Sequence, residues 1–126
     1  MKRVLSVGQC APDHSSISHF LKGICEVRVD QAQHMDDTLA ALESTEYDLV
    51  LVNRKLDIDY SDGLRILKAI KGDERFGRTP VMLVSNFADA QEQAIAAGAV
   101  RGFGKAQFGD PETIATVQSV LVETSS

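Results

Sequence analysis

The chain has 126 residues, of which 44% are hydrophobic and 25% charged, and its formal net charge is −5 at pH 7. This balance is typical of one globular domain, and we expect a single domain over 1–126 with a polar tail from about 123. The negative charge argues against nucleic-acid binding, and no apolar run reaches the ~20 residues that cross a bilayer. The apolar part of the N-terminal segment MKRVLSVGQC is too short for a signal peptide, so we expect a cytoplasmic protein without a membrane partner. Two cysteines, too few for a disulfide scaffold, do not contradict this.

The first half of the chain alternates strand patterns with helical ones. Strands and helices are predicted in turn over 2–7, 15–24, 25–29 and 35–42. The run LVLV at 49–52 is continuous, as in a strand that is covered on both faces, and it ends at Asn53. The next helix is predicted over 64–71, with Asp62 or Ser61 as its N-cap.

The second half repeats this alternation, with strands predicted over 80–84 and 100–105 and helices over 88–97 and from Asp110 onward. Five strand–helix pairs predict an α/β fold with a parallel sheet and helices on both faces. Ligands bind such sheets beyond the carboxyl ends of the strands, at the switch in strand order. We therefore expect the functional residues directly after the first, third, fourth and fifth strands, at Gly8-Gln9-Cys10, Asn53, Ser85-Asn86 and Lys105.

Segments at these positions make the chain similar to the receiver domain of two-component response regulators. They are YDLVLVN (47–53), SDGLRILKAIK (61–71), TPVMLVS (79–85) and AAGAVRGFGK (96–105), in the family's order and near its spacing. The resemblance runs from Lys2 to about Val122. It implies a single doubly wound (βα)5 flavodoxin-like fold with sheet order 2-1-3-4-5. It also implies signalling through a protein partner, an attached output domain or a homodimer, by a domain that is not an enzyme.

The chemistry of that family requires particular side chains. An aspartate after strand three accepts a phosphoryl group, acids after strand one help to hold Mg²⁺, and a hydroxyl and a lysine bind the phosphoryl oxygens. By the resemblance, Ser85 and Lys105 match the last two, whereas Asn53 replaces the acceptor and Gly8-Gln9 replaces the acids. An amide cannot form an acyl phosphate. We therefore expect a pseudo-receiver that acts by protein–protein interaction, with Mg²⁺ binding lost or weak and no other cofactor.

Alternatives remain open for the function and for single residues. Asp57 or Asp59 could be a relocated acceptor, or the domain could bind a small anion in a pocket with Lys105 and Arg54 but no carboxylate opposite them. Ser85 could only satisfy local backbone groups, and Asn53 could only bond its neighbours. No zinc site is expected, because the helix between the two possible cysteine ligands is too long for them to meet. The possible ligands considered were Cys10, His14, His19 and Cys25.

Overall fold

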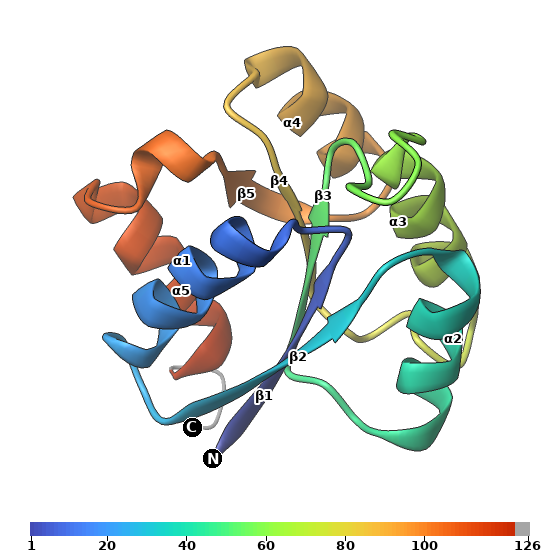
Figure 1. Ribbon diagram of the computed structural model, residues 1–126, viewed down its shortest axis with the longest axis horizontal. Coiled ribbons are helices and arrows are strands. Elements are labelled where there is room, and N and C mark those ends of the chain that lie inside the picture. Colours follow the sequence, from blue (N-terminus) through green and yellow to red (C-terminus); the bar gives the residue numbers. More distant parts are fainter. Residues whose placement is uncertain (123–126) are drawn as a thin grey trace.

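Residues 1–122 are described in this computed structural model, so the polar tail predicted from about 123 lies outside the described residues. Five strands form one parallel sheet in the order β2-β1-β3-β4-β5 (Figure 1). The strands are β1 (Lys2–Val7), β2 (Val27–Ala32), β3 (Leu49–Asn53), β4 (Val81–Val84) and β5 (Val100–Phe103). The expected α/β class and sheet order are both confirmed.

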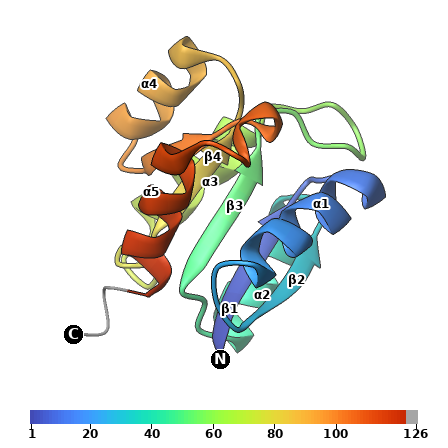
Figure 2. The same ribbon diagram turned by 90° about the vertical axis from the view of Figure 1, so that its left-hand side faces the viewer.

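Helices cover both faces of the sheet (Figure 1; Figure 2). One face carries α1 (Ala11–Lys22) and α5 (Pro111–Leu121), and the other carries α2 (Met35–Ser44), α3 (Gly63–Gly72) and α4 (Ala88–Ala96). Successive strand residues point to opposite faces, so Leu49 and Leu51 join the core under α1 and α5 while Val50 and Val52 join the other. This double burial explains why the run LVLV is continuous. None of the helices within 1–122 is long and apolar enough to cross a membrane.

Helix α1 begins at Ala11, four residues before its predicted start at Ser15. Cys10 is the N-cap residue and Pro12 lies in the first turn, where the fixed φ of proline suits a helix and its missing N–H costs no bond. The pattern of apolar residues begins only at Ile17, which is why the periodicity alone set the start too late. The earlier start places Asp13 in the first turn of a helix.

Strand β5 and its surroundings also differ from the prediction. The strand ends at Phe103, and residues Lys105–Gln107 form a short 3₁₀ helix, η1. Its pairing with β4 is irregular: Met82 faces Val100 while Val84 faces Phe103, so β5 has one residue more than β4 in this interval. The side chain of Gln91 accepts the N–H of Gly102 in this bulge at 2.9 Å and donates to the carbonyls of Leu83 and Ser85.

Candidate functional site

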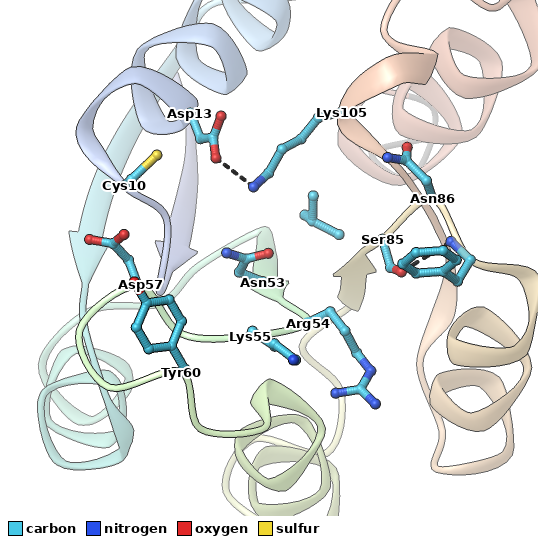
Figure 3. Close-up of a pocket in the computed structure, with 12 residues that line it drawn as sticks. Cys10, Asp13, Asn53, Arg54, Lys55, Asp57, Tyr60, Ser85, Asn86 and Lys105 are labelled. Atoms are coloured by element: carbon cyan, nitrogen blue, oxygen red, sulfur yellow. Dashed lines mark hydrogen bonds and ion pairs between the residues drawn. The ribbon is translucent and has the colours of Figure 1, made fainter.

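Polar and charged side chains surround a cavity at the carboxyl edge of the sheet (Figure 3). Its volume is about 420 Å³, and its walls come from the segments that follow β1, β3, β4 and β5. The lining residues are Cys10, Asp13, Asn53, Arg54, Lys55, Asp57, Tyr60, Val84, Ser85, Asn86, Phe87 and Lys105. The cavity therefore lies where the topology predicted a binding site.

The structure brings Asn53, Ser85 and Lys105 together on the wall of this cavity. The other two residues predicted for the site, Gly8 and Gln9, are not part of the lining. The side chain of Gln9 is only 1% exposed, and neither its amide nitrogen nor its amide oxygen has a hydrogen-bond partner among residues 1–122. Gln9 is thus a buried residue beside the site and contributes no atom to its wall.

A hydrogen bond from Asn53 connects the end of β3 to the residue that follows β1. Its side-chain nitrogen donates a hydrogen bond to the carbonyl of Gly8 at 3.1 Å, and the N–H of Asp57 donates to the same carbonyl at 2.9 Å. Gly8 has φ of +75°, and a Cβ there would lie 2.4 Å from Cδ2 of Leu56. A glycine is therefore required at the point where these segments meet. The bond to Gly8 agrees with the interpretation of Asn53 as a residue that bonds its neighbours.

Lys105 has a carboxylate partner, so the expectation of a pocket without one was wrong. Its ammonium group donates to Oδ2 of Asp13 at 2.5 Å, and Figure 3 shows the two side chains pointing toward one another. The hydrogen bond from Lys105 is the main reason that the pKa of Asp13 lies below its usual value; burial opposes it, and a bond from the Cys10 thiol adds to it. The sequence carried a signal for this pair in Pro12, which marks a helix start just before Asp13.

Ser85 supports the start of α4. Its side-chain oxygen accepts the N–H of Phe87 at 3.1 Å, and its own N–H donates to the carbonyl of Phe103 at 3.0 Å. The neighbouring Asn86 accepts the N–H of Ala106 through its side-chain oxygen at 3.3 Å. Both side chains therefore hold the segments after β4 and β5 in place, as the structural interpretation of Ser85 predicted.

The loop between β3 and α3 is folded back on itself. Lys55 and Asp62 form an isolated antiparallel bridge, and Leu56 anchors the loop with 2% exposure. Asp62 caps α3 by accepting the N–H of Leu64 and also pairs with Arg54, both at 2.9 Å. The prediction of Asp62 as N-cap is thereby confirmed.

The two aspartates of this loop that could be relocated acceptors occupy different places. Asp57 lies on the cavity wall. Asp59 is not in the lining, and its carboxylate accepts the N–H of Ser61 at 2.9 Å. If an aspartate of this loop meets a ligand in the cavity, the geometry favours Asp57.

The cavity wall carries charges of both signs, with three cationic side chains and two carboxylates. Lys105 is paired with Asp13 and Arg54 with Asp62, whereas neither Lys55 nor Asp57 forms a salt bridge within residues 1–122. No group of three or more His, Cys, Asp or Glu side chains in the described part of the chain is placed to hold a metal ion. Cys10 and Cys25 are both free thiols.

Comparison with known proteins shows what this fold is. No protein-family model matches the sequence, and no curated protein does. Among solved structures, the signal receiver domain of a DNA-binding response regulator from Colwellia psychrerythraea has a TM-score of 0.78 at 19% identity, over 95% of this chain and 98% of its own. A second match is the receiver domain of the sensor histidine kinase PA1611 from Pseudomonas aeruginosa, which holds a magnesium ion in its active-site cleft. Its TM-score is 0.72 at 20% identity, and the match covers 97% of this chain and 95% of that domain.

NtrX from Brucella abortus has a TM-score of 0.77 at 24% identity; the match covers 99% of this chain but only 28% of NtrX. These likenesses establish that the chain has the receiver-domain fold of two-component response regulators. At identities below 25% these likenesses define the fold alone, and the function depends on the chemistry of the site.

Proposed function

We propose that this chain is an atypical receiver domain that signals through protein–protein contact and is not switched by phosphorylation at the end of β3. The observation that carries this proposal is the hydrogen bond from the side-chain nitrogen of Asn53 to the carbonyl of Gly8. By its resemblance to receiver domains, the chain has Asn53 at the position where an aspartate would accept the phosphoryl group. The amide is neutral, is a poor nucleophile, and is already used to join two strand ends.

The charges of the pocket support the same proposal. A phosphoryl-binding lysine has to present its charge to the incoming oxygens, yet Lys105 already pairs with Asp13. An anion that reached Lys105 would have to displace this carboxylate or lie beside it. Asp13 thus occupies, within the chain itself, the place that an external anion would take on the lysine.

The side chains present do not suit Mg²⁺, which prefers several carboxylate oxygens and keeps its water reluctantly. Of the two carboxylates on the wall, Asp13 is bonded to Lys105, which leaves Asp57 alone. Asn53 turns its amide N–H toward Gly8, and Gln9 is buried away from the wall. We therefore propose that magnesium binding is lost or weak.

A domain that does not depend on phosphorylation still needs a surface for its partner. By the resemblance, α4, β5 and α5 supply it, and Val100 on β5 is 36% exposed. We propose a cytoplasmic protein whose partner is a separate protein, a second copy or an attached output domain. The match to NtrX, which covers only 28% of that longer chain, supports the last of these.

The test is the intact mass of the protein after incubation with Mg²⁺ and a small acyl-phosphate donor, together with amide NMR spectra on addition of beryllofluoride. We expect no gain in mass and no shifts around Asn53, Ser85 and Lys105. A gain of one phosphoryl group would overturn the proposal. Because Asp57 lies on the wall, Asp57→Ala and Asp59→Ala variants would then decide between the two relocated acceptors.

A further inference from the structure

The loop between β3 and α3 presents large apolar side chains to solvent. Tyr60 is 77% exposed and lines the cavity, and Ile58, two positions before it, is 56% exposed. Figure 2 shows this loop extending beyond the carboxyl edge of the sheet. Exposed apolar groups that gather at one place indicate a binding surface, whereas single ones do not.

Backbone hydrogen bonds hold this loop in one conformation. The N–H of Asp57 donates to the carbonyl of Gly8 at 2.9 Å, and the N–H of Tyr60 donates to the carbonyl of Leu56 at 2.7 Å. Leu56 is buried, and its N–H donates to the carbonyl of Ser61 at 2.9 Å. A surface that is ordered before it binds loses little conformational entropy on binding.

The backbone at Tyr60 is strained. With φ of +58°, Tyr60 is the only residue other than glycine in 1–122 that has a positive φ. This left-handed conformation is unfavourable for a bulky side chain, whereas glycine adopts it without a steric cost. Strain of this kind is typical of functional sites, so the exposed ring at this position indicates a role in binding.

Free charges of opposite sign flank the Tyr60 ring. Lys55 and Asp57 are both exposed, and neither forms a salt bridge within residues 1–122; the carboxylate of Asp59 accepts the N–H of Ser61. In Figure 3 the carboxylate of Asp57 lies on one side of the ring and the ammonium group of Lys55 on the other. A uniformly acidic partner would be repelled by Asp57 and a uniformly basic one by Lys55. The loop therefore matches a surface that carries one charge of each sign in the opposite order.

We propose that the partner is a second copy of this chain, bound loop to loop about a two-fold axis that passes near Tyr60. A two-fold axis reverses the order of the charges, so Lys55 of each copy faces Asp57 of the other. The two Tyr60 rings then pack against each other between the two ion pairs. The inference rests on the proposed function, whose partner it identifies, and it requires Asp57 to be free of a phosphoryl group.

Sedimentation velocity over a range of protein concentrations measures the dissociation constant of the dimer. Lys55→Glu makes positions 55 and 57 both negative and Asp57→Lys makes them both positive, so each variant replaces both ion pairs by repulsive contacts. We expect each variant alone to dimerise at least about tenfold more weakly than wild type. Lys68→Glu, on the exposed surface of α3, makes the same change in net charge as Lys55→Glu and should dimerise as wild type does.

An equimolar mixture of the two charge variants tests the pairing itself. In the mixed dimer, the negative positions 55 and 57 of one copy face the positive positions of the other. The mixture should therefore associate within about threefold of the wild-type affinity. A loss of folding or of loop structure in either variant would not be restored by mixing. Variants that stay monomeric when mixed would overturn the proposal.

Two further variants distinguish this loop from other surfaces. Tyr60→Asn removes the ring but keeps a residue that adopts a positive φ readily, so dimerisation should be severalfold weaker. Val100→Asp places a charge on β5, on the surface that the resemblance suggests for a partner, and should leave the dimer unchanged. A wild-type chain that is monomeric at all concentrations would overturn the proposal. A dimer that is lost in Val100→Asp and kept in the loop variants would also overturn it.

The intact-mass experiment separates this inference from the proposed function. If the mass shows no phosphoryl group and the chain is monomeric, the dimer is wrong and the phosphorylation-independent receiver stands. A phosphoryl group on Asp57 would overturn both, because that carboxylate would then hold the phosphoryl group and not pair with Lys55 of a second copy.

Discussion

Asn53 at the end of β3 donates its side-chain N–H to the carbonyl of Gly8 at the end of β1, 3.1 Å away. Aspartate has nearly the same shape but no hydrogen to donate at neutral pH, and it would place a carboxylate oxygen beside that carbonyl. We expect Asn53→Asp to lower the free energy of unfolding by about 1–3 kcal/mol. Urea denaturation at pH 7 measures the change.

Asn86→Asp is the matched control, because it adds the same charge to the same cavity. The side-chain oxygen of Asn86 accepts the N–H of Ala106, and an aspartate keeps an acceptor at that place. Its stability should lie within about 0.5 kcal/mol of wild type. Equal stability of the two variants would show that the bond to Gly8 is unimportant.

Asp13→Asn should release Lys105. We expect inorganic sulfate to shift the amide signals near Lys105 in the variant and not in the wild-type chain, because the lysine is then no longer neutralised by Asp13. Asp89→Asn is the control, since Asp89 is also an acid in the first turn of a helix. The same sulfate response in all three proteins would contradict the role assigned to the pair.

The stability difference between Asp13→Asn and wild type should depend on pH. The pKa of Asp13 is lowered in the folded chain, chiefly by the hydrogen bond from Lys105. A lowered carboxyl pKa stabilises the fold above the unfolded value of ~3.9, and this contribution is lost as pH falls through the folded pKa. Asp13→Asn should therefore be less stable than wild type by up to about 1 kcal/mol at pH 7. The difference in stability should shrink as pH falls below the unfolded value and through the folded pKa of Asp13, and a constant difference at every pH would refute this account.

Two buried glutamines should respond in opposite directions to replacement by methionine. Gln9 is 1% exposed and its amide has no hydrogen-bond partner in the described chain, so Gln9→Met removes an uncompensated polar group. Gln91 is 5% exposed, and its amide makes three hydrogen bonds, to Leu83 in β4, to Ser85 directly after β4 and to Gly102 in β5. We expect thermal and urea unfolding to show Gln9→Met at or above wild-type stability and Gln91→Met lower by about 2–3 kcal/mol. Equal losses of stability in the two variants would indicate that the Gln9 amide has a hydrogen-bond partner.

Gly8→Ala tests the close contact between the residue after β1 and the loop after β3. At φ of +75°, an added Cβ is strained, and it also meets Leu56 at 2.4 Å. We expect a loss of about 1–3 kcal/mol in urea denaturation. Gly109→Ala is the control, because an added Cβ there has no atom within 4 Å, so its change should be below about 1 kcal/mol. A well-tolerated Gly8→Ala would show that the loop after β3 can move away.

Several parts of the site were predictable from the sequence. The continuous run before Asn53 marked a central strand, and parallel strands bring their carboxyl ends to one edge, which placed Asn53, Ser85 and Lys105 together. Gln9 shows the limit of that reasoning. Its position directly after a strand predicted a place in the pocket, yet its side chain is buried elsewhere. Sequence position fixes where the backbone passes, and packing decides where the side chain points.

The sequence by itself determined the alternation of five strands and five helices, because hydrophobic periodicity and caps are local properties of the chain. Only the tertiary structure decided which polar groups meet. Asp13 and Lys105 are 92 positions apart, and Asn53 lies 45 positions from Gly8. Their contacts depend on where α1 begins, how the loop after β3 folds and where β5 ends. Pro12 marks the start of α1 locally, but the course of the loop and the end of β5 are settled by long-range packing.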